Sequence, residues 1–565
     1  MENVDLTKMP YNLDNEEITW VEETINKMTK EEKIGQLFFH FFDNFEDTYV
    51  ESVLDNYHIG GMRYLTDKGS VLQSFINFAQ SKSKVPLFVA ANCDAGGNGA
   101  VREGTYIASG AQVEATRDEK VAYNVGYVSG VESKAIGVNW NFGPNADILF
   151  NWRNTIVNTR SYGSDADQII KYNREFIEGQ RVSGIMECLK HFPGDGVDER
   201  DQHLLMSVND LDANQWDESF GKVYQTAIDE GLQTIMLGHI ALPKYQKKLN
   251  PELEDKDILP ATLSYEIATE LLKNKMKFNG LIVTDASHMI GLSATMQRKD
   301  YVPLTIAAGC DMFLFFNDLE EDFQYMMDGY ENGVITEERL HDALKRILGF
   351  KAKLKLHNKT AEELTISETE LSNIGTDEFK TLQKEAADKA ITLVKNIKEE
   401  LPITPDKHPR IKLYLLYGEE GGAFGFDKSS KKIIIEELER VGFKVDLHTK
   451  IERPKGKIEK YKENYDASFV FADIQGYATE NNIRVRWGAS TSNEIPWYVH
   501  ETPTVFVSLN FTTHLTDVPM VKTYINSYKN TRTSIRQTIE KIMGQSEFKG
   551  KYNENVFCDK WDTRL

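Results

Sequence analysis

The residues best placed to do chemistry lie in one short stretch. Lys190 and His191 follow residues 183–189, a short and largely apolar run typical of a buried strand, and a loop rich in proline and glycine comes next. Asp201 and His203 stand two residues apart in that loop. An imidazole can donate and accept a proton near neutral pH, and a neighbouring carboxylate fixes its tautomer. The stretch therefore predicts a site that binds a polar ligand and transfers protons.

A second candidate is a carboxylate that also ends an apolar run. Residues 280–284 read Gly-Leu-Ile-Val-Thr and are followed directly by Asp285. An aspartate at this position can cap the next helix. It can also serve as a nucleophile if it faces a substrate. The sequence pattern alone leaves both roles open.

The elements that must position these residues alternate along the chain. Eight apolar runs are separated by segments with a helical pattern, which predicts βαβ units and a parallel sheet. The eight expected strands span residues 34–41, 59–64, 86–92, 136–142, 184–189, 234–239, 280–284 and 311–316. Eight such units over this length predict an α/β fold of the (β/α)8, TIM-like barrel type.

Polar residues gather at the carboxyl ends of these expected strands, which is where a barrel of this type has its active site. From the third strand to the seventh, the polar residues at or after the strand ends are Asp94 and Arg102, then Asn145, Asp147 and Arg160, then Lys190 and His191, then His239, and then Asp285. Side chains that can bind a polar ligand would thus meet at one end of the barrel.

A second, smaller domain is expected after the barrel. The barrel should occupy residues 1–355, a charged helical linker residues 356–385, and an α/β sandwich with a parallel sheet residues 386–565. Strands are predicted at 411–416, 443–447, 467–472 and 503–509, with a further strand fed by 387–396 and an amphipathic helix at 431–441.

Composition narrows the class of protein. A length of 565 residues favours two domains, and a net charge of −21 argues against nucleic acid or an anionic membrane as partner. The first residues lack the pattern of a secretory signal, and no apolar run is long enough to span a membrane. The four cysteines are far apart, which favours the reducing cytoplasm and disfavours a zinc site. No nucleotide-binding motif stands out, so we expect neither a cofactor nor a metal. The oligomeric state stays open.

The run KHFPGDGVDERDQH at 190–203 resembles the signature of glycoside hydrolase family 3, in its β-N-acetylglucosaminidase, NagZ-like branch. The segments MTKEEKIGQL at 28–37 and AAGCDMFL at 307–314 also resemble this family, so the similarity covers most of residues 15–350. Two residues depart from the usual pattern: Asp195 replaces a histidine and Gln202 replaces a serine or threonine. The later segments AITLVKN and TVFVSLN resemble the C-terminal domain of two-domain members.

The resemblance implies a role for each candidate residue. Asp285 would be the nucleophile of a retaining glycosidase, and His203, paired with Asp201, would be its acid/base. The residues implied in sugar recognition are Asp94, Arg102, Arg160, Lys190 and His191.

The expected function is a cytoplasmic exo-β-N-acetylglucosaminidase that acts on cell-wall fragments, with a small carbohydrate or a muropeptide as substrate. A β-glucosidase is disfavoured, because its acid usually comes as a carboxylate from the C-terminal domain. A phosphorylase stays open, because an imidazole repels phosphate less than a carboxylate does. A non-catalytic sugar-binding relative is the alternative from another class. The presence of Asp285, Asp201 and His203 counts against it, although Asp195 keeps it open.

Overall fold

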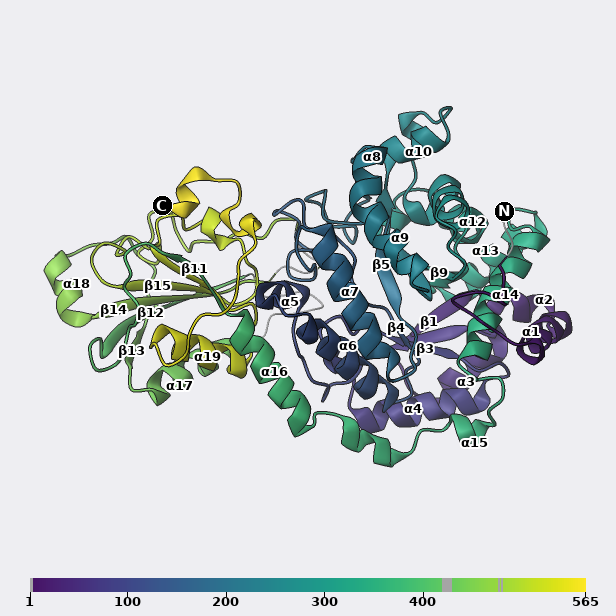
Figure 1. Ribbon diagram of the computed structural model, residues 1–565, viewed down its shortest axis with the longest axis horizontal. Helices are drawn as coiled ribbons and strands as arrows, with labels where there is room; N and C mark the ends of the chain where they lie inside the picture. The colour runs from purple at the N-terminus through teal and green to yellow at the C-terminus, as the bar shows by residue number, and fades with distance from the viewer. Residues whose placement is uncertain (1–3, 419–428, 476–477, 479–480) are drawn as a thin grey trace. The chain divides into compact units, whose positions relative to one another are not determined.

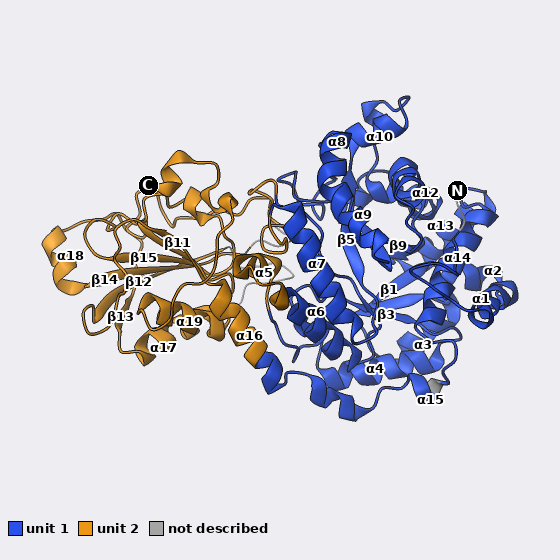
Figure 2. Cartoon of the chain, in the orientation of Figure 1, with its two compact units in different colours: residues 1–107, 122–149, 164–380 blue, residues 108–121, 150–163, 381–565 orange. Residues whose placement is uncertain are grey.

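The chain folds into two compact units (Figures 1 and 2). The structure is a computed structural model, and it describes residues 4–418, 429–475, 478 and 481–565. Unit 1 comprises residues 1–107, 122–149 and 164–380, and unit 2 comprises 108–121, 150–163 and 381–565. The predicted domain boundaries lay at residues 355 and 385. They did not assign to the second domain the two earlier segments, 108–121 and 150–163, that belong to unit 2.

Unit 1 is built on a ring of eight parallel strands, which confirms the predicted barrel. The order in the sheet is β4-β3-β2-β1-β10-β9-β7-β5. Parallel bridges from Trp140 to Met186 and from Asn145 to Lys190 join β4 to β5 and close the ring. The strands are β1 (Phe38–Phe42), β2 (Gly61–Tyr64), β3 (Phe88–Ala91), β4 (Trp140–Asn141), β5 (Cys188–Phe192), β7 (Thr234–Leu237), β9 (Leu281–Ala286) and β10 (Met312–Leu314).

Helices surround this ring in Figure 1. They are α1 (Asn15–Lys27), α2 (Lys30–Gly35), α3 (Asp47–Tyr57), α4 (Gly69–Lys82), α6 (Glu119–Lys134), α7 (Ala166–Arg181), α8 (Ala213–Trp216), α9 (Lys222–Asp229), α10 (Pro243–Leu249), the π-helix η5 (Glu266–Lys275), α11 (Ile290–Ser293), α12 (Arg298–Ala308), α13 (Leu319–Glu331), α14 (Glu337–Lys353) and α15 (Ala361–Leu364). A short two-stranded sheet, β6 (Ser207–Val208) with β8 (Ile240–Ala241), was not predicted.

The first strand shows how the sequence divides the core into two layers. Phe39 points into the barrel, where its ring lies 5.4 Å from that of Trp140. Phe38 points outward and stacks on Phe316 at 4.1 Å. Since successive side chains of a strand face opposite sides, a continuous apolar run fills both the barrel interior and the layer under the helices.

The observed bounds of all eight barrel strands differ from the predicted ones, and the differences in the first and fifth strands have clear causes. The run at 34–41 begins as the end of α2, because Thr29 and Glu32 form a capping box that starts a helix there. The observed β5 extends to Phe192, so Lys190 and His191 lie within the strand rather than after residue 189. The apolar pattern stops at Lys190 because its side chain binds polar partners inside the barrel mouth.

Unit 2 contains a six-stranded sheet of order β11-β16-β15-β14-β12-β13. The strands are β11 (Thr392–Asn396), β12 (Arg410–Tyr417), β13 (Lys444–Leu447), β14 (Ala467–Asp473), β15 (Thr504–Ser508) and β16 (Thr523–Asn526). The unit's helices are α5 (Gly110–Thr116), α16 (Asp377–Ala390, begun in unit 1), α17 (Ser429–Arg440), α18 (Ile458–Asn464) and α19 (Arg532–Ile542). Ile434 of α17 and Ile539 of α19 pack on the sheet side that carries Leu413. The neighbouring Tyr414 faces the opposite layer, so the sheet is covered on both faces.

The sheet of unit 2 is mixed, which corrects the prediction of a parallel sheet. Strand β11 pairs with β16 in antiparallel fashion, whereas the other neighbours are parallel. No local pattern predicted β16, a short strand of four residues. The pairing direction of β11 depends on this strand, which follows it by more than a hundred residues.

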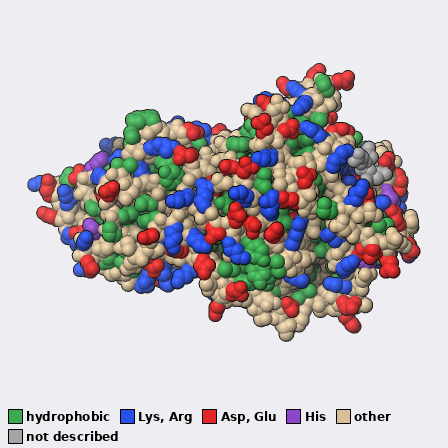
Figure 3. Space-filling model, viewed as in Figure 1, with side chains coloured by type: hydrophobic (Ala, Val, Ile, Leu, Met, Phe, Trp, Pro, Cys, Tyr) green, Lys and Arg blue, Asp and Glu red, His purple; other side chains and the backbone are tan. Residues whose placement is uncertain are grey.

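The surface carries charged side chains of both signs. On the face in Figure 3, acidic and basic side chains are interspersed over both units. Among the described residues, no helix combines the length and the apolar character that crossing a bilayer requires.

One buried histidine of unit 2 predicts a pH-dependent stability. Neither ring nitrogen of His514 has a hydrogen-bond partner in the described part of the chain, and burial lowers its pKa from 6.5 to about 4. Between these values the unfolded chain binds a proton that the folded chain does not. Stability therefore falls as the pH falls through this window, by up to about 3 kcal/mol. We expect His514→Leu to lose less thermal stability than the wild type between about pH 7 and about pH 4.5.

Scanning calorimetry of the transition of unit 2 measures this difference. The exposed His500 gives the control, His500→Gln, which should follow the wild type. Parallel pH curves for wild type and His514→Leu would contradict the role of His514.

Candidate active site

Asp285 lies at the carboxyl end of β9, at the mouth of the barrel. Leu281 and Val283, earlier on the strand, are buried in the barrel core. The register of β9 against β10 shifts after Val283, and Asp285 Oδ2 lies on the side of the strand that faces His191 of β5. Its Oδ1 accepts a hydrogen bond of 2.7 Å from the backbone N–H of Ala286.

Imidazoles surround the Asp285 carboxylate. His191 Nε2 lies 3.8 Å from Asp285 Oδ2, which is longer than a hydrogen bond. Burial on its own raises the pKa of Asp285, but the charges of His191, His239 and His203 outweigh it and hold the pKa below its ordinary value. Asp285 is therefore ionised at neutral pH, as a nucleophile must be.

A fully buried carboxylate, Asp147, orients His191. Asp147 Oδ2 accepts from His191 Nδ1 at 2.8 Å, and Oδ1 accepts from the backbone N–H groups of His191 at 3.1 Å and Asp195 at 2.9 Å. Burial raises the pKa of Asp147, but the charge and hydrogen bond of His191 and these N–H groups lower it overall. Because Nδ1 donates to Asp147, Nε2 of His191 faces Asp285.

Lys190 joins Asp94 to the same mouth. Its ammonium lies 3.1 Å from Asp94 Oδ1 and also donates to the backbone oxygen of Phe142. Only 2% of the Lys190 side chain is exposed, against 23% for Asp94. The lysine is thus fixed below the mouth, and Asp94 keeps an accessible edge toward a ligand.

His203 and Asp201 form the predicted pair. Asp201 Oδ1 accepts from His203 Nδ1 at 2.7 Å and from the His203 backbone N–H at 2.9 Å. Asp201 is fully buried, whereas 30% of the His203 side chain is exposed. This geometry leaves Nε2 of His203 as the ring nitrogen that can exchange a proton with a ligand.

The loop that carries this pair is tied to neighbouring strands. Gln202 accepts a hydrogen bond of 2.7 Å from the backbone N–H of His239, just after β7. The backbone oxygen of His203 accepts from the N–H of Ile290, at the start of α11. A Cβ on Gly238 would lie 3.0 Å from the Gln202 carboxamide oxygen, so glycine lets this side chain approach. Gln202, which replaces the expected serine or threonine, thus anchors the loop.

The second departure, Asp195, also has a structural role. Its backbone N–H binds Asp147, and its side chain accepts from the N–H of Gly196 at 2.6 Å. Its backbone oxygen accepts from the N–H of Ile148. Asp195 therefore closes the turn after β5.

The other two predicted residues are Arg102 and Arg160. Arg102 pairs with Asp67 at 2.8 Å, and 58% of its side chain is exposed. Arg160 belongs to the segment 150–163 of unit 2, where its backbone oxygen lies against Gly110 at the start of α5. The structure brings together Asp94, Lys190, His191 and Asp285 with the pair of Asp201 and His203.

The sequence pattern assigned no role to Asp147 and His239, although Asp147 follows a predicted strand and His239 ends one. His239 Nε2 donates to the backbone oxygen of Ala286 at 3.0 Å, and burial lowers its pKa. Position after an apolar run was the available signal for both residues. The signal did not show which strand-end residues contact a ligand and which support a neighbour.

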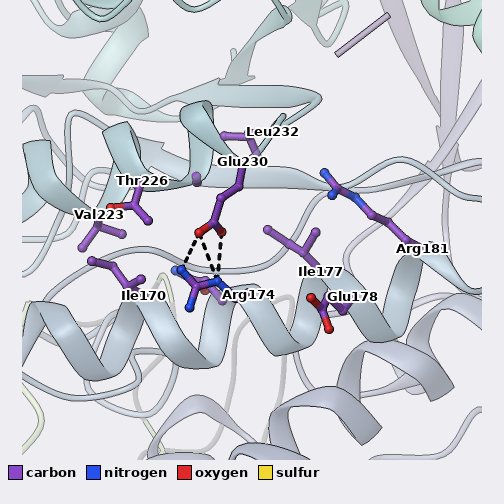
Figure 4. Close-up of a pocket in the computed structure, with 11 residues that line it drawn as sticks. Ile170, Arg174, Ile177, Glu178, Arg181, Val223, Thr226, Glu230 and Leu232 are labelled. Atoms are coloured by element: carbon purple, nitrogen blue, oxygen red, sulfur yellow. Dashed lines mark hydrogen bonds and ion pairs between the residues drawn. The ribbon is translucent and has the colours of Figure 1, made fainter. Parts of the chain in front are cut away.

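A separate cavity of about 160 Å³ lies between α7 and α9 (Figure 4). Arg174 and Glu230 bridge it through hydrogen bonds that include two of 3.1 Å, and Ile177 and Val223 line it. None of the predicted site residues lines this cavity. Within the described ranges, no cluster of three or more histidine, cysteine or acidic side chains is arranged to hold a metal.

Comparison with known proteins defines the family. The model of the glycosyl hydrolase family 3 N terminal domain matches residues 29–350. A β-N-acetylglucosaminidase/β-glucosidase from Cellulomonas fimi is 37% identical over 572 residues, which is 100% of both chains. The solved structure of the β-glucoside phosphorylase BglX is 38% identical, with a TM-score of 0.93 over 99% of both chains.

A family 3 β-N-acetylglucosaminidase from Paenibacillus sp. str. FPU-7 shares the fold, with a TM-score of 0.77 at 22% identity over 93% of this chain and 98% of that one. The chain belongs to glycoside hydrolase family 3, and it is an enzyme of this glycosidase class. The family predicted from residues 190–203 is confirmed.

Proposed function

We propose that the enzyme cleaves β-linked N-acetylglucosaminides and glucosides at the nonreducing end with retention of configuration. The observation that carries this proposal is the Asp285 carboxylate, held ionised among His191, His203 and His239 at the barrel mouth. The relative from Cellulomonas fimi, whose full length this chain covers, is named for both sugar classes.

The reaction follows from the two carboxylate–imidazole arrangements. Asp285 attacks the anomeric carbon and forms a glycosyl ester, while His203, protonated at Nε2, gives its proton to the departing oxygen. Asp201 stabilises the imidazolium through Nδ1. In the second step, neutral His203 takes a proton from the acceptor, which attacks the anomeric carbon, and the bond from this carbon to the Asp285 oxygen breaks and frees the carboxylate.

The remaining polar groups would bind the sugar. Asp94 accepts hydrogen bonds from hydroxyls, and Nε2 of His191, next to Asp285, accepts from a hydroxyl when the ring is neutral and donates when it is protonated. Lys190 holds Asp94 in place. Arg102 and Arg160 stay predicted binding residues on the family resemblance.

For the natural substrate, we propose N-acetylglucosamine-containing cell-wall fragments that are met in the cytoplasm. The described structure is compatible with a reducing compartment, because Cys93, Cys188, Cys310 and Cys558 are all buried free thiols.

A second candidate differs in the acceptor, which would be phosphate instead of water. The structure of BglX, described as a β-glucoside phosphorylase, is similar over nearly the whole of this chain. The charge of the acid/base supports this candidate. The acid/base is the imidazole of His203, and its carboxylate partner, Asp201, is fully buried. An anionic acceptor is repelled less by this arrangement than by a carboxylate acid/base.

Replacement of the nucleophile tests the first proposal. We expect Asp285→Asn to lower kcat by roughly a thousandfold or more, since an amide cannot form the ester, while ligand binding persists. In the wild type, a 2-deoxy-2-fluoro glucoside with an activated leaving group should label Asp285, as peptide mass spectrometry can show. A label on another carboxylate would contradict the assignment.

The leaving group tests the role of His203. We expect His203→Ala to slow glycosides of alkyl alcohols by roughly 10²–10⁴-fold but dinitrophenyl glycosides far less, because only the former need a proton. The dependence of kcat/KM on leaving-group pKa measures this. His341→Ala, which removes a histidine paired with Glu22 on the outside of α14, is the control. Equal losses on all glycosides would make His203 a binding residue.

The identity of the product distinguishes phosphate from water as the acceptor. With inorganic phosphate present, the phosphorylase candidate predicts a β-glycosyl 1-phosphate, detectable by phosphorus NMR, and a rate that rises with phosphate concentration. Free sugar as product at a rate independent of phosphate would exclude this candidate and leave the hydrolase.

A further inference from the structure

Two side chains that no motif marks, Phe41 and Arg63, lie in the top interior layer of the barrel. Phe39 packs inside on Trp140, so Phe41, two residues later on β1, faces the same side. Phe41 is the register partner of Arg63 on β2. A Cβ on Gly61 would lie 2.5 Å from the Phe39 ring, so Gly61 also faces the interior, and so does Arg63 two residues later.

Aromatic rings fix the Arg63 guanidinium in this layer. Its central carbon lies 5.7 Å from the centre of the Phe41 ring, within the range of a cation–π contact. The Phe41 ring in turn packs edge-on against Phe315, just after β10, at 5.7 Å. The guanidinium is thus placed by packing before any ligand arrives.

Arg63 has no polar partner among the residues that the structure describes. Neither a hydrogen bond nor an ion pair joins its guanidinium to them, and its side chain is only half-exposed. Its N–H donors face solvent at the mouth and have no acceptor in the described part of the chain, so the group can donate to a ligand that supplies acceptor oxygens.

Asn92 provides a second, independent observation at the same mouth. It follows Phe88 and Ala90 by four and two residues, and Phe88 packs inside on Trp140. Its carboxamide oxygen is buried and accepts no hydrogen bond from the described part of the chain. A buried oxygen of this kind is uncommon, and a donor from a ligand would satisfy it after a small rotation of the amide.

We propose that Arg63 and Asn92 bind hydroxyl groups of the nonreducing-end sugar, a role that rests on the proposed function. A hydroxyl accepts from a guanidinium and donates to a carboxamide oxygen, whereas an ionised carboxylate can only accept. The two groups together therefore suit a neutral sugar, which supplies both functions.

The ring order places these residues on the sugar side of the scissile bond. Strand β2 lies between β1 and β3, and the chain turns from β3 toward Asp94. The loop with His203 is tied to the far side of the ring, to His239 after β7 and Ile290 after β9. Since His203 serves the departing group, Arg63 and Asn92 face the sugar that Asp285 captures.

Deoxy glycosides test this proposal with Arg63→Met, which keeps the packing on Phe41 but removes the donors. We expect kcat/KM on the nitrophenyl N-acetylglucosaminide or glucoside to fall roughly tenfold to a hundredfold. On the one deoxy analogue (3-, 4- or 6-deoxy) that lacks the bound hydroxyl, wild type and variant should be equally slow. Arg174→Met, on the outer face of α7, is the matched control and should behave as wild type.

An equal loss on every deoxy analogue, or no loss on the parent glycoside, would overturn the role of Arg63. Tighter binding of a 6-phosphorylated glycoside by the wild type than by Arg63→Met, with no hydroxyl effect, would make it an anion site instead. Calorimetric binding of glucose and N-acetylglucosamine separates this proposal from the cleavage reaction. Weaker binding by Arg63→Met supports it even if turnover is absent, and a wild type that binds neither sugar would overturn both.

Discussion

The active site depends on one buried carboxylate, Asp147. A buried charge is costly unless hydrogen bonds satisfy it, and Asp147 meets this requirement with donors from the end of β5 and from the turn that follows. The same bonds fix the direction of His191 and the start of the loop that leads to His203. The hydrogen bonds that stabilise Asp147 therefore determine where His191 and the loop to His203 lie relative to the bridge between β4 and β5.

Asp285, unlike Asp147, lies too far from His191 for a hydrogen bond. Its environment lowers its pKa through nearby imidazoles, but the nearest of them, His191, stays 3.8 Å away and forms no hydrogen bond to it. A lysine or arginine in direct contact would also keep the carboxylate ionised, but it would compete with the anomeric carbon for the attacking oxygen. Ionisation without a tight ion pair leaves Asp285 reactive, and Lys190 is instead occupied by Asp94.

The sequence was sufficient wherever the signal was local. Eight apolar runs predicted the barrel, and their ends located Lys190, His191 and Asp285, because the carboxyl ends of parallel strands meet at one side. Features that depend on distant segments were not predictable. The antiparallel pairing of β11 requires β16, and the inclusion of 108–121 and 150–163 in unit 2 requires packing that no local pattern contains.

The position of Arg63 shows why the rest of the site could not be predicted. Glycine is disfavoured in strands, so the Gly60–Gly61 pair gives β2 a poor strand pattern and hides the alternation that would turn Arg63 inward. In the barrel, however, the Phe39 ring occupies the space that a side chain at 61 would need. The aromatic interior layer therefore demands the glycine that weakens the local signal, and the same register sets Arg63 against Phe41. Packing between strands, which is invisible in a single run of residues, decides which polar side chains face the barrel mouth.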